Sequence, residues 1–376
     1  MWFKHNRMLL GKISLLLVIL LMSGVSVFGC VRTGAQPKGW SGGTIANGTL
    51  FLGSMKGKLV AMSASEGSHL WEVTLETSKP AGGFGCAPAS TAVAIYGTPA
   101  VDGELVYVGG YNGKIYAISS GSGALRWVYP REGNLQPIVG GPVVAWEKVY
   151  FGSSDGKLYV LKAATGDKEW DFETGGKIWS TPAIDGDMIF IGSFDNKLYA
   201  LNAMSGEKKW EFETGGAIAS TPLVYNNTVY IGSFDRYLYA LNATDGSLRW
   251  KFPAGNWFWA KPVAYNNVIY AANLDGKVYA LAVENGDKVA ELDLESPVSS
   301  SPILVGNSIV VASEEGRVWA IDTSNNEKRL LKDMEENIYA PLSASEGIIY
   351  IHTEKDALYA VEVQTGVIRS FTLSSK

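Results

Sequence analysis

Cysteine and histidine are scarce in this chain. Its 376 residues contain two cysteines, Cys30 and Cys86, and three histidines. Two cysteines cannot form a disulfide framework, so packing must hold the fold together. The histidines His5, His69 and His352 fall at unrelated positions, and no ligand spacing indicates a zinc site. The sequence also lacks a Gly-x-Ser-x-Gly elbow and a Walker loop, so it points to no catalytic residue and no metal site.

Charged residues are few as well, at 18% of the chain, and the 37 acidic residues outnumber the 32 basic ones. Nucleic acid is therefore not expected as a partner, because phosphate binding requires a basic face. Hydrophobic residues make up 47%, which argues against disorder. The 43 glycines and 14 prolines, together with 12 tryptophans and 18 tyrosines, are typical of many short strands joined by tight turns.

The first 29 residues have the order of an export signal, with basic residues, then an apolar run, then small residues. They lead into Val27-Phe28-Gly29-Cys30, which resembles the bacterial lipobox, whose cysteine becomes the lipidated first residue of the mature protein. Phe28 departs from the small residue usual at its position. We therefore expect a lipoprotein signal peptide over residues 1–29 and a lipidated Cys30.

An uncleaved anchor is the alternative, since Met8–Phe28 could nearly span a bilayer. In both cases the rest of the chain is expected outside the cytoplasm and attached to a membrane. Residues 30–39 would then be the lipidated cysteine and a tether, and Cys86 would be a lone thiol.

The rest of the chain is a repeat with a period of 40 residues over most of its length. The segment that begins at Ser180 recurs at Ser220 with nearly the same sequence. One marker position identifies eight copies: Gly53, Gly109, Gly152, Gly192, Gly232, Ala272, Ala312 and His352.

Each copy is expected to form four strands, which in one copy are Trp179–Ile184, Met188–Gly192, Lys197–Leu201 and Lys208–Glu213. A four-stranded antiparallel unit of this size cannot bury both of its faces alone. Radial stacking of the eight units solves this and leaves only short edges. The sequence predicts an all-β fold: an eight-bladed β-propeller over residues 40–376, preceded by a signal peptide and closed by packing between its first and last blades.

The outer half of each copy carries a finer pattern, a Tyr-Ala-Leu strand followed by a turn glycine and, four residues later, a tryptophan. The tryptophans are Trp71, Trp127, Trp170, Trp210 and Trp250. This pattern resembles the tryptophan-docking repeat of the PQQ-type quinoprotein propellers. The resemblance implies that each indole packs between blades and donates its N–H across the junction. Ala290, Leu330 and Ser370 replace the tryptophan in the last three copies, so we expect weaker junctions there.

The resemblance raises the question of a quinone, which in the dehydrogenases of this class lies in the central funnel beside a calcium ion and a catalytic carboxylate. Many of those enzymes also place a vicinal cysteine pair over the quinone, and this chain has none. Its one long insert, from Lys79 to Ile95, holds neither acids nor histidines. We expect no cofactor, neither PQQ nor calcium.

The start of each innermost strand offers the best candidate surface, because its loop opens at one rim of the central channel. One position there varies from copy to copy while its neighbours repeat, and variation also arises where nothing constrains a residue. We single out an aromatic and basic set for binding a partner or ligand. Its members are Tyr96, Lys177, Trp179, Trp257, Trp259 and Lys261.

A lipid-tethered, eight-unit propeller of this repeat without a cofactor pocket resembles the BamB family of envelope lipoproteins. The resemblance implies a non-catalytic scaffold, monomeric by itself, that binds protein partners in the cell envelope, among them a subunit that assembles outer-membrane β-barrels. Two alternatives stay open at this point. One is a propeller that binds a sugar or peptide on Trp179 and Trp259, and the other is a reduced PQQ-dependent dehydrogenase.

Overall fold

The computed structural model describes residues 39–75 and 93–373. The signal peptide, the lipidation at Cys30, the tether and Cys86 lie outside the described residues and stay predictions. In the described residues the only regular secondary structure is β-strand. Accordingly, this part of the chain contains no helix long and apolar enough to cross a membrane.

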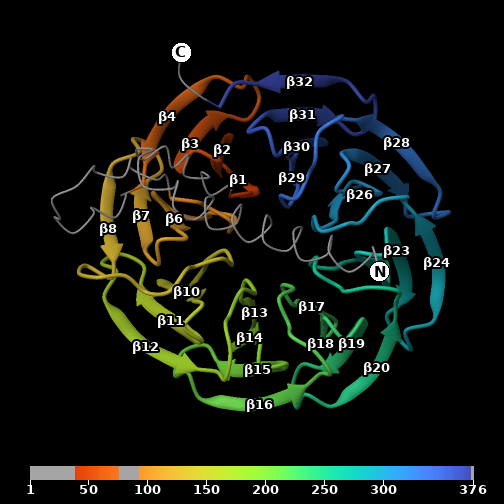
Figure 1. Cartoon of the computed structure of the whole chain (residues 1–376), viewed down its shortest axis with the longest axis horizontal. Helices are drawn as coiled ribbons and strands as arrows, with labels where there is room; N and C mark the ends of the chain where they lie inside the picture. The colour runs from red at the N-terminus through yellow and green to blue at the C-terminus, as the bar shows by residue number, and fades with distance from the viewer. Residues whose placement is uncertain (1–38, 76–92, 374–376) are drawn as a thin grey trace, which may run out of the picture. The chain divides into compact units, whose positions relative to one another are not determined.

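The strands form eight four-stranded antiparallel sheets, each built from four consecutive strands. The sheets stand around a central axis as the blades of a propeller (Figure 1), which confirms the predicted fold. The first four blades comprise β1 (Gly43–Ala46), β2 (Thr49–Gly53), β3 (Lys58–Ser63), β4 (His69–Thr74), β5 (Ala100–Asp102), β6 (Leu105–Gly109), β7 (Ile115–Ser119), β8 (Leu125–Tyr129), β9 (Val143–Ala145), β10 (Lys148–Gly152), β11 (Lys157–Lys162), β12 (Lys168–Glu173), β13 (Ala183–Asp185), β14 (Met188–Gly192), β15 (Lys197–Asn202) and β16 (Lys208–Glu213). The last four comprise β17 (Leu223–Tyr225), β18 (Thr228–Gly232), β19 (Tyr237–Asn242), β20 (Leu248–Pro253), β21 (Val263–Tyr265), β22 (Val268–Ala272), β23 (Lys277–Ala282), β24 (Lys288–Asp293), β25 (Ile303–Val305), β26 (Ser308–Ala312), β27 (Arg317–Asp322), β28 (Lys328–Asp333), β29 (Ser343–Ser345), β30 (Ile348–His352), β31 (Leu358–Glu362) and β32 (Ile368–Phe371).

The innermost strand of the fourth blade is shorter than expected. In the fourth blade the sequence predicts a strand from Trp179, whereas β13 begins at Ala183, directly after Pro182. Proline has no N–H to donate to a strand ladder, so the preceding residues stay outside the sheet. They form instead the lining of the central channel.

The hydrophobic core lies between the blades. One cluster joins Phe190 and Ala200 of the fourth blade to Val229 and Ile231 of the fifth. The second strand of a typical blade, such as β14, is buried over four consecutive residues because neighbouring blades cover both of its faces. Packing of this kind holds the ring together, since the described residues contain no cysteine.

Each of the five docking indoles donates a hydrogen bond to a backbone carbonyl of the next blade. The pairs are Trp71 to Ser120 at 2.9 Å, Trp127 to Ala163 at 2.8 Å, Trp170 to Met204 at 3.1 Å, Trp210 to Ala243 at 3.0 Å and Trp250 to Val283 at 3.0 Å. The indole thus covers apolar surface and satisfies a carbonyl at the same junction.

The sequence predicts that the last three blades lack the indole N–H donor at the junction with the next blade. An arginine replaces this donor in the seventh and eighth blades, so the prediction of a missing donor holds only for the sixth. Ala290 pairs with Ala280, where Trp210 of the fourth blade pairs with Ala200. In the seventh and eighth blades the register differs by one residue, because no β-bulge lies at the point where the earlier blades have one.

Arginines therefore take the place of the indole in the last two blades, not Leu330 and Ser370. Arg329 pairs with Ala320 and donates to the carbonyl of Val363 at 2.7 Å. Arg369 donates to the carbonyl of Ser65 at 2.7 Å. Both junctions keep a donor that reaches the next blade.

Within residues 39–75 and 93–373 no strand is exchanged between the first and last blades, and side chains join the two blades. The Tyr350 hydroxyl donates to the carbonyl of Ala64 at 2.9 Å. The His352 Nδ1 atom lies 3.1 Å from the carbonyl oxygen of Ser41. Asp356 accepts a hydrogen bond from the backbone N–H of Met55 at 2.9 Å. Polar contacts and a shared apolar cluster thus join the two blades, as the unpermuted order of the strands predicts.

Candidate functional site

The propeller has two faces, which the chain direction distinguishes. We call connector face the one that carries the connections between blades and the turn between the second and third strands of each blade. The hairpin face carries the turns between the first and second strands and between the third and fourth strands. The candidate residues come from the connections and therefore belong to the connector face and the channel that it leads into.

Three of the predicted residues lie together on the connector face, linked by two phenylalanines. Trp179 meets Phe194 edge to face, with ring centroids 4.6 Å apart, and Phe194 lies 5.9 Å from Phe234. Phe234 is nearly parallel to Trp257 at 4.5 Å and to Trp259 at 5.7 Å. We call these five side chains the aromatic ridge. Trp257 is 42% exposed, so the ridge offers large apolar surface to solvent.

Backbone hydrogen bonds fix the segments that carry the ridge. The N–H of Phe194 donates to the carbonyl of Lys177, and the N–H of Leu274 donates to the carbonyl of Trp257. Turns between the second and third strands are thereby tied to the neighbouring connections. A surface built on such paired loops changes little when a partner binds, which lowers the entropy cost of binding.

Aspartates hold these turns in shape and are saturated by protein donors. Asp235 accepts hydrogen bonds from the backbone N–H groups of Gly215 and Tyr237 and from the hydroxyl of Tyr239. Asp195 and Asp275 have the same three kinds of donor. These carboxylates serve the fold, and within the described residues no group of three potential ligands gathers that could hold a metal ion.

Lys177 extends the ridge with a positive charge. Its ammonium nitrogen lies 5.7 Å from the centroid of the Trp179 ring, within range of a cation–π interaction. The Trp179 indole N–H donates to the Ser154 hydroxyl at 3.0 Å, which fixes the orientation of its ring. The ridge and Lys177 together resemble the aromatic and cationic residues that dominate protein interfaces.

Tyr96 belongs to a different aromatic group. Its ring contacts Trp40 at 4.8 Å and Tyr111 at 5.4 Å, and Trp40 contacts Tyr339 at 5.6 Å. Burial and the neighbouring Tyr111 raise the pKa of Tyr96, which stays a neutral phenol at physiological pH. Among the described residues no ring contact joins this group to the ridge, although Tyr96, Trp179 and Trp259 line the same part of the central channel.

Lys261 lies inside the central channel, which Trp179 and Trp259 of the ridge also line. The narrow half of the channel, about 100 Å³, is lined by Trp40, Tyr96, Trp179 and Trp259 among others. The wide half, about 480 Å³, opens toward the hairpin face. Lys261 lines both halves.

The channel does not fit a quinone held beside a calcium ion. No aspartate or glutamate lines either half, so the described residues offer no carboxylate for calcium there and no catalytic carboxylate. The aromatic half is also smaller than the roughly 300 Å³ at which small-molecule sites begin. We derive no chemistry through such a group.

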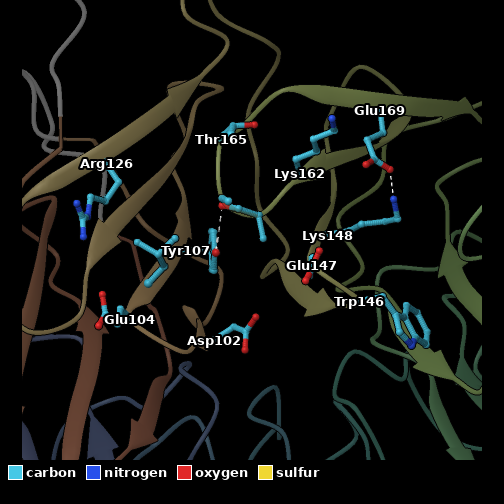
Figure 2. A pocket seen from close by; sticks show the side chains of 13 residues that line it. Asp102, Glu104, Tyr107, Arg126, Trp146, Glu147, Lys148, Lys162, Thr165 and Glu169 are labelled. Carbon is cyan, nitrogen blue, oxygen red and sulfur yellow. Dashed lines mark hydrogen bonds and ion pairs between the residues drawn. The ribbon is translucent and has the colours of Figure 1, made fainter.

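A larger groove of about 860 Å³ lies between the second and third blades on the hairpin face (Figure 2). Acidic and basic residues line this groove in similar numbers, so it favours neither an anionic nor a cationic ligand. Lys148 forms an ion pair with Glu169, and the Tyr107 hydroxyl donates to the carbonyl of Ala163 at 3.2 Å. Trp146 lies at its edge and is 45% exposed.

Sequence reasoning missed Phe194 and Phe234, which complete the ridge. Both stand in a Ser-Phe-Asp turn, at a position where the other copies have Met55, Tyr111, Ser154, Leu274, Glu314 and Glu354. A phenylalanine at an exposed turn of two successive copies is the signal that could have identified them.

Eight four-stranded blades, joined by indoles that donate across each of the first five junctions, define a PQQ-like β-propeller. Comparison with protein families gives the assignment within this class. The chain belongs to the family described as outer membrane protein assembly factor BamB, whose sequence model matches residues 31–177 and again residues 170–369.

Solved structures agree with the fold. BamB from Moraxella catarrhalis superposes with a TM-score of 0.69 at 19% identity, over 85% of this chain and 93% of that one. The computationally designed Ika8 protein superposes with a TM-score of 0.72 at 15% identity, over 86% and 96%. None of the curated proteins compared with the chain matches it. Both likenesses show the fold alone.

Proposed function

We propose that this chain is a non-catalytic scaffold of the cell envelope, anchored by a lipid at Cys30, that binds a protein partner through the aromatic ridge. In a bacterium with two membranes, the partner is a subunit that assembles outer-membrane β-barrel proteins. The family assignment supports this role, because the description of the family names outer membrane protein assembly. The export signal and the lipobox support the location.

The observation that carries the proposal is the ridge itself. Five aromatic rings in continuous contact, with Trp257 exposed and Lys177 beside Trp179, lie on one face of the propeller. Large apolar surface left in water costs free energy that a partner recovers by covering it. Tryptophan and phenylalanine that are already packed also lose little rotamer entropy on binding.

Site-specific photocrosslinking in living cells tests the proposal. A photoreactive phenylalanine analogue placed at position 257 should crosslink to one envelope protein, identified by mass spectrometry as a barrel-assembly subunit. The matched control places the analogue at position 146, which is equally exposed but on the hairpin face. Crosslinking to the same protein from both positions, or to none from position 257, would show that the ridge is not the binding surface.

A cellular measurement addresses the role. Cells that lack the chain should contain less folded outer-membrane β-barrel protein, and the Phe234→Ala variant should restore less of it than the wild-type chain. Full restoration by a variant that has lost its crosslink at position 257 would separate barrel assembly from the ridge and contradict the proposal.

A further inference from the structure

The wide half of the central channel combines an apolar wall with a single charge. Its volume of about 480 Å³ lies within the range of small-ligand sites. The wall is largely proline and aliphatic side chain, including Pro99, Pro142, Pro262, Pro302, Leu223 and Val263. Prolines at the start of the innermost strands present rigid rings and no N–H groups, so the wall offers apolar contact without competing donors.

Lys261 is the one charged side chain among the residues that line the two halves of the channel. Most of the other blades place threonine, serine or glycine at its position, as in Thr221 and Ser301. Its ammonium makes no hydrogen bond and no ion pair within the part of the chain that the structure describes. Desolvation lowers the pKa of Lys261, and no neighbouring carboxylate opposes this effect.

The charge of Lys261 is accessible to a ligand. Protein atoms of the channel surround this residue, yet it remains exposed to the solvent of the channel. Since no carboxylate of the described lining stands beside it, an anion that enters the channel would supply the counter-charge.

Hydroxyl groups that line the channel together with Lys261 add donors. The Thr181 hydroxyl accepts the N–H of Gly141 at 2.8 Å, and the Ser301 hydroxyl accepts the N–H of Lys261 at 3.1 Å. Each accepting hydroxyl still carries a hydrogen, and among the described residues neither donates it to a protein group. The hub therefore offers an ammonium and hydroxyl donors at the base of an apolar funnel.

We propose that the wide half of the channel binds the free C-terminal carboxylate of a peptide whose last side chain is apolar. The carboxylate pairs with Lys261 and accepts from the hydroxyls of Thr181 and Ser301, while the apolar side chain contacts the proline wall. An inorganic anion would leave that wall uncovered, and an uncharged apolar ligand would leave Lys261 unpaired. The inference deepens the proposed function, on which it rests, because it adds a second contact for a protein partner on the face opposite the ridge.

The test compares a free C-terminus with a blocked one. The probe is a hexapeptide of alternating glycine and serine that ends in leucine, labelled with fluorescein at its N-terminus. Its binding to the full-length protein in detergent is followed by fluorescence anisotropy. We expect the free acid to bind at least tenfold more tightly than the same peptide with a C-terminal amide.

Three variants connect the effect to the site. Lys261→Met should abolish the preference for the acid, and Lys261→Arg should retain part of it. The control Lys177→Met removes a lysine from the connector face and should leave the preference unchanged. Thermal unfolding of Lys261→Met should occur near the wild-type temperature, since the residue is exposed to the solvent of the channel. That result excludes misfolding as the cause of lost binding.

Equal affinity for acid and amide, or a preference that survives Lys261→Met, would overturn the proposal. Binding of octanoate at Lys261 without binding of the peptide would also overturn it, because the ligand would then be a fatty acid. Crosslinking from position 257 should persist in the Lys261→Met variant. The peptide assay tests the channel site, and the crosslink from position 257 tests the ridge. A negative result in one experiment therefore does not contradict a positive result in the other.

Discussion

Gly246 of the fifth blade lies directly against the indole of Trp210 of the fourth. A β-carbon on Gly246 would be 2.6 Å from Cε3 and 2.7 Å from Cδ2 of that ring, and the backbone there has φ +74. The position thus requires glycine twice, for the left-handed conformation and for the close approach of the ring. The same pair recurs at the other four indoles, between Trp71 and Gly123, Trp127 and Gly166, Trp170 and Gly206, and Trp250 and Gly286.

Gly246→Ala should destabilise the protein more than a positive φ alone explains. We expect a loss of about 2–3 kcal/mol, because the indole must leave its hydrogen bond to Ala243 or the blades must separate. The control is Gly103→Ala, where φ is +55 and no atom lies within 4 Å of the added carbon. It should cost only about 1 kcal/mol. Urea unfolding of both variants gives the comparison, and equal losses would show that the ring contact contributes nothing.

At the junction between the sixth and seventh blades both members of the tryptophan–glycine pair are replaced. Ala290 stands where the indole would be, and Asn326, with φ +58, stands where the glycine would be. Ala290→Trp alone should be neutral or destabilising, because the side chain of Asn326 occupies the space beneath the ring. Asn326→Gly alone should cost stability, since it removes the 3.0 Å hydrogen bond with Tyr270.

The two changes together should restore the docking pair. We expect the double variant to be more stable than the sum of the single changes by about 1 kcal/mol or more. Thermal or urea unfolding of the four proteins of this cycle measures the coupling. Additive effects would mean that the glycine and the indole do not depend on each other.

The repeat made most of the fold predictable, because eight copies of one strand pattern admit few arrangements. The bulges were not predictable from spacing. Counting from the turn glycine assigns Leu330 and Ser370 to the docking position, while the strand pairing places Arg329 and Arg369 there. A bulge adds one residue between two ladder bonds, and residue types do not reveal where along the strand it lies or whether it is present.

The candidate surface was predictable in part. Trp179 and Trp259 stand out because they occupy the position that varies from copy to copy, and Trp257 lies two residues before Trp259. Phe194 was missed because turns are interpreted through glycine and aspartate. Tyr96 lines the channel with Trp179 and Trp259 as grouped, but its ring contacts are with Trp40 and Tyr111. The repeat predicts where a residue lies within its own blade. It does not predict which side chains of different blades are in contact, because these distances depend on how the ring closes.

Trp257→Ala should separate binding from stability. The side chain is 42% exposed, so its removal should change the free energy of unfolding by less than about 1 kcal/mol. Affinity for the partner captured in crosslinking should fall tenfold or more, as expected for an aromatic residue at the centre of an interface. Trp146→Ala, an equally exposed tryptophan on the other face, is the control for surface plasmon resonance with the purified partner. Equal losses of affinity would contradict a role specific to the ridge.

Asp356 should make ring closure sensitive to acid. Burial disfavours its charged form, but hydrogen bonds from His352 and from the Met55 N–H outweigh this and lower its pKa. A lowered pKa in the folded state means that ionised Asp356 stabilises the protein above the unfolded value of about 3.9. This contribution is lost as the pH falls through the folded pKa.

Asp356→Asn should therefore be less stable than wild type at pH 7, by about 1–2 kcal/mol, and the difference should shrink below pH 4. Urea unfolding at pH 7, 4 and 3 measures this. Asp245→Asn is the control, since the pKa of this carboxyl is also lowered, by hydrogen bonds from Ser247, but the residue is exposed and far from the closure. A pH-independent difference for Asp356→Asn would mean that its charge does not stabilise the junction.

Backbone strain at the turn of Trp146 and Glu147 lowers the stability of the protein. Both residues have positive φ, 48 and 60, a conformation that favours asparagine and glycine and that Asn226 and Asn227 adopt in another blade. Trp146→Asn combined with Glu147→Gly should raise the free energy of unfolding by about 1 kcal/mol, because the strain of two left-handed residues is relieved. Asn226→Ala, which introduces strain at the equivalent turn, should lower it by a similar amount. If the Trp146 variant is less stable than wild type, the contact of its ring with Tyr150 outweighs the backbone strain, and the turn is held by packing instead.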